Sequence, residues 1–182
     1  PVGMVMTEGK CAVKDQVEMY TCDRSSPDEC KTMCERGDAD SCDILAGLVY
    51  AAGQSAQNLE AFAALTDAAC QGGSASGCFN RGLAAFNGWG TAVNKAQALE
   101  LFFRSCQGGI APGCSMAGLH FFQGDGVPRD TSKAAILFRA GCNAGDHLGC
   151  TNLGVLQMSG DGVPKDEVAA LDNFKRACDG ND

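Results

Sequence analysis

Apolar residues recur along this chain at three- and four-residue spacing, in paired segments separated by glycine-rich turns. In one stretch the first apolar segment covers about residues 113–123, and the second follows Asp130 and continues to Cys142. Ala134, Leu137 and Phe138 share one face of the second segment, which is the pattern of an amphipathic helix. The sequence GDGVP between the segments supplies glycines for positive φ and a proline for rigidity. The pattern therefore predicts a hairpin of two helices.

The hairpin pattern repeats with a fixed period. The cysteines at positions 34, 70, 106, 142 and 178 are 36 residues apart, and the blocks overlay without gaps, although the first is degenerate. A period of this length is typical of solenoids. One slot before each second helix holds a good N-cap residue, which is Asn58, Asn94, Asp130 or Asp166. We therefore predict an all-α superhelix with repeats at 34–69, 70–105, 106–141 and 142–177, the start of a fifth repeat, and a capping segment at 1–33.

Each of the first four cysteines in this series has a second cysteine eight residues later. The first lies in the last turn of one helix and the second in the first turn of the next, so a chain reversal brings the sulfurs within disulfide reach. Zinc sites use closer pairs with more Cys or His, whereas this chain has two histidines and no C-x-x-C redox motif. We predict the disulfides Cys34–Cys42, Cys70–Cys78, Cys106–Cys114 and Cys142–Cys150.

The N-terminal segment holds three more cysteines. Ser26, Pro27 and Glu29 have the pattern of a helix start, which places Cys30 and Cys34 on one helix face. With Cys34 committed to Cys42, Cys30 pairs backward, with Cys22 or with Cys11. We take Cys22–Cys30 as the fifth bridge, which leaves Cys11 and Cys178 unpaired or, for Cys178, joined to another molecule.

The repeated motifs C-x7-C, "NLG", "GDGVPKD" and "AALDNF" resemble those of the Sel-one-like repeat family, relatives of the tetratricopeptide repeats. One C-x7-C per repeat is similar to the cysteine-rich branch found in Helicobacter. The resemblance covers roughly residues 34–182. It implies a right-handed α-α superhelix that binds proteins, with cysteines linking neighbouring helices. It also implies a second candidate activity, since some members are linked to penicillin binding or hydrolysis.

Composition indicates the compartment in which the protein works and the classes of partner that it is not expected to bind. Twelve cysteines arranged for disulfides predict an oxidising compartment, which is the periplasm, the cell surface or the exterior of a bacterium. A net charge of −8 argues against binding to nucleic acid or to anionic membranes. No apolar run is long enough to span a bilayer, so the expected route to a membrane is a lipid anchor lost upstream. We expect no metal and no cofactor.

Catalytic motifs are scarce. None of the ten serines is followed by Lys at the third position, and S-D-N and K-T-G are absent, so β-lactam chemistry rests on the family resemblance alone. His120, beside Phe121 and Phe122, has the setting of a structural residue, and nothing predicts that Ser115 and Asp125 join it in a triad. The sequence therefore favours a non-enzymatic binding scaffold.

The first helix of each repeat is expected to line the concave, partner-binding side of the solenoid. Asn80 and Asn152 offer amides that can both donate and accept, and Phe86, Phe122 and Met158 form a repeated apolar stripe. Leu83, Leu119 and Val155 are either core or groove residues. Trp89 stands where other turns have Asp, as an anchor for a partner or a packing plug. The full predicted partner-binding set is Asn80, Phe86, Asn87, Trp89, Met116, Phe122, Gln123, Asn152, Met158 and Ser159.

Overall fold

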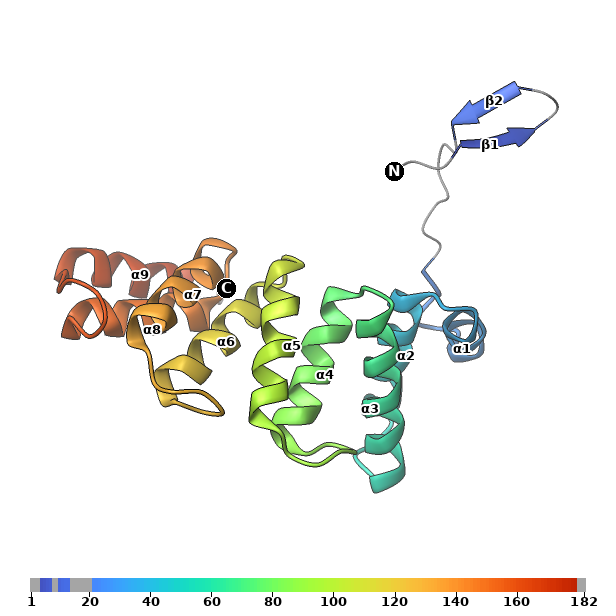
Figure 1. The fold of residues 1–182 in the computed structure, drawn as a ribbon, viewed down its shortest axis with the longest axis horizontal. Coiled ribbons are helices and arrows are strands. Elements are labelled where there is room, and N and C mark those ends of the chain that lie inside the picture. The colour runs from blue at the N-terminus through green and yellow to red at the C-terminus, as the bar shows by residue number, and fades with distance from the viewer. Residues whose placement is uncertain (1–3, 8–9, 14–20, 180–182) are drawn as a thin grey trace.

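The computed structural model describes residues 4–7, 10–13 and 21–179, and for the two strands it describes the backbone only. The described part is a two-stranded antiparallel hairpin followed by nine helices in an elongated stack (Figure 1). Met4 pairs with Val13 and Thr7 with Lys10 across the strands, which the sequence did not predict. The elements are β1 (Met4–Thr7), β2 (Lys10–Val13), α1 (Pro27–Glu35), α2 (Ala39–Ala51), α3 (Ala56–Gln71), α4 (Ala75–Asn87), α5 (Lys95–Gln107), α6 (Ala111–Gln123), α7 (Thr131–Asn143), α8 (His147–Ser159) and α9 (Glu167–Asp179).

The helices pack in sequential order, as expected for a solenoid in which each unit contacts its neighbours. We call α2, α4, α6 and α8 the A helices, and α3, α5, α7 and α9 the B helices. Figure 1 shows α1 and α9 at opposite ends of the stack. None of the described helices is both long and apolar enough to cross a membrane. The all-α hairpin fold predicted from the sequence is confirmed.

Most helix starts follow the predicted capping chemistry. Asn94 and Asp130 accept hydrogen bonds from the backbone two or three residues into α5 and α7. The prediction for Asn58 is wrong, because Ser55 caps α3 and the Asn58 amide donates to the Gly53 carbonyl instead. Ser26 precedes α1 but makes no side-chain capping bond.

Glycines in the A helices let the B helices approach closely. A Cβ built on Gly82 would lie 2.7 Å from the ring of Phe102, and one on Gly118 would lie 2.7 Å from the ring of Phe138. Both rings are fully buried and form the largest side chains of the core. Because these glycines have no side chain, the aromatic ring of the facing B helix packs directly against the A helix and stabilises the hairpin.

Four disulfides link the end of one helix to the start of the next A helix, and a fifth joins α1 to the segment that precedes it. The bridges are Cys22–Cys30, Cys34–Cys42, Cys70–Cys78, Cys106–Cys114 and Cys142–Cys150, with Cα separations of 4.3–4.9 Å. All five predicted pairs are confirmed, including Cys22 as the partner of Cys30. Cys178 is exposed and forms no disulfide with a described residue, and the side chain of Cys11 lies outside the described part.

Glycine-rich turns between the A and B helices pack against the preceding repeat. Gly90, Gly126 and Gly162 occupy equivalent slots and have φ of 62°, 75° and 74°. A Cβ on Gly90 would overlap the carbonyl of Leu59, and one on Gly126 would lie 2.8 Å from the backbone nitrogen of Ala96. Glycine is required at this slot both by the backbone conformation and by the lack of space.

Acidic turn residues add a second link between repeats. Asp125 pairs with Lys95 at 2.7 Å, and Asp161 pairs with Arg129 at 2.6 Å. The hydroxyl of Thr131, and after it Arg129, hold the pKa of Asp161 below its usual value. A lowered carboxyl pKa means that this contact stabilises the fold above the ordinary Asp pKa and is lost as the pH falls.

Replacing Gly90 by Ala is expected to destabilise the fold by about 3 kcal/mol or more, because a backbone clash adds to the strain of positive φ. Gly109→Ala is the matched control, since Gly109 has φ of 89° and open space around its Cβ position. It should cost only about 1 kcal/mol. Chemical denaturation of the two variants measures both values, and equal losses would contradict the close approach at Gly90.

Thiol alkylation before non-reducing digestion and mass spectrometry should recover the five bridges and label Cys178, or find it linked to a second molecule. The reason is that Cys178 has no cysteine beside it in the described fold. An intramolecular bond from Cys178 to Cys11, Cys22 or Cys30 would show that the stack is not open.

Candidate partner-binding site

A hollow of about 210 Å³ opens between the first two A helices. Its walls come from α2, α3, α4 and the turn after α4. We call it the aromatic pocket, and its lining residues are Gly47, Tyr50, Phe62, Asn80, Leu83 and Trp89.

The pocket exists because one helix position lacks a side chain. Gly47 occupies the slot that later repeats fill with Leu83, Leu119 and Val155. A Cβ built on Gly47 meets no atom within 4 Å and requires no unusual φ. The glycine at this site therefore leaves open space rather than relieving a clash.

Three aromatic rings form the floor of the pocket. The ring centroid of Tyr50 lies 5.3 Å from that of Phe62 and 5.2 Å from that of Trp89, and Phe62 and Trp89 are 6.1 Å apart. Phe62 is buried, whereas Tyr50 and Trp89 are half-buried. Trp89 thus packs against other rings and also lines the pocket, and its role as an anchor for a partner stays a prediction.

Asn80 forms the polar edge of the pocket. Its Nδ2 donates to Oδ1 of Asp43 at 2.7 Å, and the hydroxyl of Ser76 donates to Oδ2 of the same carboxylate at 2.7 Å. These bonds join α4 to α2 across two repeats. The donor of the Asn80 amide is therefore used inside the protein, and its carbonyl oxygen accepts no hydrogen bond from any described residue.

The other predicted binding residues do not gather in this pocket. Asn87 is exposed and donates from Nδ2 to the carbonyl of Leu83, and Asn152 donates to the carbonyl of Leu148 at 2.8 Å. Ser159 donates to the carbonyl of Val155. These polar groups bond to the backbone of their own helices.

Apolar members of the predicted set follow the A helices in succession. Phe86 lies 5.5 Å from the ring of His120, and Phe122 lies 6.4 Å from the ring of Phe138. Met158 is 41% exposed. The two remaining members are half-buried or exposed, namely Met116 and Gln123.

Sequence reasoning missed Gly47, Tyr50 and Phe62, which belong to the degenerate first repeat. The signal for Tyr50 was present, because it occupies the same slot as Phe86, Phe122 and Met158. With Tyr50 included, the stripe extends over all A helices.

His120 has a structural role. Its Nδ1 lies 2.8 Å from the backbone carbonyl of Asp125, so Nδ1 carries the proton that is donated. Its ring is buried against Phe86 and Phe102. The carboxylate of Asp125 faces Lys95, and the hydroxyl of Ser115 is buried without a hydrogen-bond partner. The three residues therefore form no catalytic triad.

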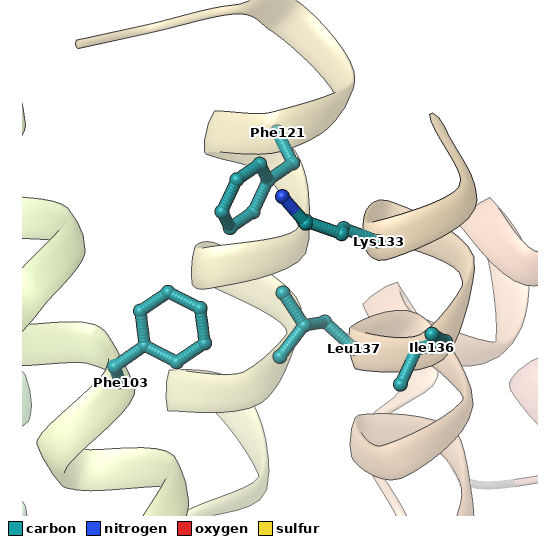
Figure 2. A pocket seen from close by; sticks show the side chains of 5 residues that line it. All are labelled: Phe103, Phe121, Lys133, Ile136 and Leu137. Atoms are coloured by element: carbon teal, nitrogen blue, oxygen red, sulfur yellow. The ribbon is translucent and has the colours of Figure 1, made fainter. Parts of the chain in front are cut away.

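A second hollow of about 220 Å³ lies among α5, α6 and α7 and was not predicted. Figure 2 shows Phe103 on α5 facing Leu137 on α7, with Phe121 of α6 between the two helices. Lys133 lies with its Nζ 5.4 Å from the Phe121 ring centroid, and Ile136 is 64% exposed. We call this hollow the B-face groove, because its outer walls are B helices.

The apolar lining of the B-face groove is not repeated at the neighbouring junctions. The slot of Phe103 holds Asp67 in the preceding repeat, where it pairs with Arg81 at 3.2 Å. In the following repeat the same slot holds Arg139. The B-face groove therefore belongs to one junction between repeats. Among the described residues, no group of acidic, cysteine or histidine side chains is suited to hold a metal ion.

The Sel1 repeat family profile matches residues 75–110, 111–146 and 147–182. Each matched segment begins at the first residue of an A helix, α4, α6 or α8. The cysteine-based boundaries at 70, 106 and 142 describe the same period shifted by five residues (75 − 70 = 5).

Solved structures of Sel1 repeat proteins share the fold. A protective antigen of uropathogenic Escherichia coli, c5321, aligns with a TM-score of 0.79 and 22% identity over 86% of this chain and 33% of its own. A Sel1 repeat protein of Oxalobacter formigenes aligns with a TM-score of 0.79 and 21% identity over 87% of this chain and 65% of its own. This chain thus spans a third of the first protein and under two thirds of the second.

Cysteine-rich protein B of Helicobacter pylori aligns with 26% identity and a TM-score of 0.56, over 71% of this chain and 93% of its own. No curated protein sequence matches the chain. The three matched repeats cover more than half of the residues, and the helical stack and disulfides agree with them. The chain therefore belongs to the Sel1 repeat family.

Proposed function

We propose that this protein is a non-enzymatic scaffold that binds a protein or peptide segment along the A helices, and that these helices form the concave side of the superhelix. The observation that carries the proposal is the aromatic pocket between α2 and α4, a preformed apolar hollow with a polar edge on that face. Pockets of this composition are where proteins hold ligands.

The apolar stripe extends the binding surface beyond the pocket. Tyr50, Phe86, Phe122 and Met158 recur at one slot of successive A helices. On α8 two members of this face are markedly open, Val155 at 45% and Met158 at 41% exposed. A row of partly exposed apolar side chains in adjacent repeats suits an extended peptide or a helix laid across the repeats.

Polar residues run beside the stripe. Asn87, Gln123 and Ser159 each follow a stripe residue by one position and are exposed. Asn87 and Ser159 donate to the backbone of their own helices, so the groups left to bond a peptide backbone and fix its register are the amide of Gln123 and the amide oxygen of Asn87.

The disulfides indicate where the scaffold works. Five bridges persist only where thiols are not kept reduced, which indicates an oxidising extracytoplasmic compartment. We propose the periplasm, the cell surface or the exterior of a bacterium.

Selection from a displayed library of random peptides, followed by fluorescence anisotropy with the purified chain, tests the binding face. Gly47→Leu and Met158→Asp alter the two ends of the A-helix stripe, and Ile136→Asp is the matched control on the B face. We expect at least one of the A-face variants to weaken the selected peptides about tenfold, because a buried anchor is lost. Ile136→Asp should bind as the unaltered chain does.

Circular dichroism and thermal unfolding of each variant show whether its fold is retained. The proposal is wrong if Ile136→Asp abolishes binding while both A-face variants, still folded, bind normally. It is also wrong if the selection enriches no peptide.

A further inference from the structure

We infer that the aromatic pocket binds the cationic side chain of an arginine or lysine in an extended peptide. This inference rests on the proposed function and names the chemistry of the ligand at that site.

The two middle repeats provide the reason, because each places a cation of its own over the aromatic ring at this slot, although the two cations come from different positions of the repeat. Lys95 lies with its Nζ 5.7 Å from the ring centroid of Phe86, and Arg129 lies 5.7 Å from that of Phe122. Phe86 and Phe122 are the repeat equivalents of Tyr50. Cations within about 6 Å of a ring centroid are attracted by the negative face of the ring.

The same cations are also held by the acidic turn residues. Lys95 pairs with Asp125, and Arg129 pairs with Asp161. In both places an aromatic ring and a cation of one repeat lie together with a carboxylate from the turn of the next repeat. The turn slot of Asp125 and Asp161 is the slot that Trp89 occupies in the preceding repeat.

At the first A helix this arrangement lacks its cation. In the first repeat the position of Lys95 is Leu59 and the position of Arg129 is Gln57, and residues 37–80 contain no Lys or Arg. Tyr50 and Trp89 therefore present two half-buried aromatic rings, and none of the described cations lies over either ring; Arg81, which follows Asn80, pairs with Asp67 instead. A second ring in place of the carboxylate still attracts a positive charge.

Charge around the pocket favours the same ligand. Residues 37–80 carry five acidic side chains; Asp67 pairs with Arg81, and the other four form no ion pair with a described residue, namely Asp38, Asp40, Asp43 and Glu60. Asp43 lies one helical turn before Gly47, and the donors on its carboxylate, Ser76 and Asn80, are neutral. Its negative charge is therefore uncompensated by these bonds, and the free carbonyl of Asn80 adds an acceptor at the pocket edge.

Size and access favour a single side chain over a small-molecule ligand. The pocket volume of about 210 Å³ is below the roughly 300–1,000 Å³ of typical small-molecule sites. The open slot at Gly47 gives a long side chain a path to the aromatic floor. The apolar stripe that continues along the A helices would hold the flanking residues of the peptide.

Trp89 is the only tryptophan in the chain, so its fluorescence reports directly on the pocket. The probes are two capped Gly-Ser peptides that differ in one residue, arginine in one and its neutral isostere citrulline in the other. We expect the arginine peptide to change the Trp89 emission saturably and to bind at least about threefold more tightly, since the cation contributes the difference. Added salt should weaken only the arginine peptide.

Three variants test whether the arginine peptide binds in the aromatic pocket. Fluorescence anisotropy of the labelled peptides is the second readout. Gly47→Leu should abolish binding, because it fills the pocket with the residue type that later repeats carry. Asp43→Asn should weaken the arginine peptide about twofold or more while leaving the citrulline peptide unchanged. Asp172→Asn removes an exposed charge on α9 and should have no effect.

Equal affinity for the two peptides, binding that survives in Gly47→Leu, or no binding at all would overturn the inference. None of these results alone removes the proposed function. If library-selected peptides without basic residues bind the A face, the scaffold function stands and the cation preference is wrong. If the selection enriches nothing on that face, the function itself fails.

Discussion

The close approach of consecutive helices at the disulfides between repeats is the constraint on which the rest of this structure depends. Gly77 lies so near Ala69 that an added Cβ would be 2.5 Å from the alanine methyl, directly beside the Cys70–Cys78 bridge. Gly113 has the same relation to Ser105 beside Cys106–Cys114. Small residues and a covalent bond thus fix how closely the two helices at each of these junctions approach. Because the junction recurs with the repeat, equivalent side chains of the A helices recur along the stack.

The period, the hairpins and the disulfide pairs could be predicted from the sequence because they are local and repeated. Cys106 and Cys114 lie at adjacent helix ends, so their pairing requires only one chain reversal. Asn94 and Asp130 cap helices through bonds to residues a few positions away. Where two nearby residues competed, as Ser55 and Asn58 did, the pattern alone selected the wrong one.

The site was harder to predict because it depends on departures from the repeat. Gly47 is informative only by comparison with the leucine or valine that the other repeats carry at the same slot, and the first repeat is the one that aligns least well. Asn80 was expected to face a partner with both of its hydrogen-bonding groups. Its donor is instead held by Asp43, a residue far away in sequence that only the folded stack brings near.

Every disulfide in the described part joins cysteines eight residues apart, and none spans a whole repeat. A chain cross-linked in this way has no long-range pairing to search for during oxidation. Each bridge can close as soon as its own segment of chain is exposed to an oxidising environment, without waiting for the next repeat. Export, oxidation and stacking can then proceed in step from one end, and the low sequence separation of the contacts favours rapid folding.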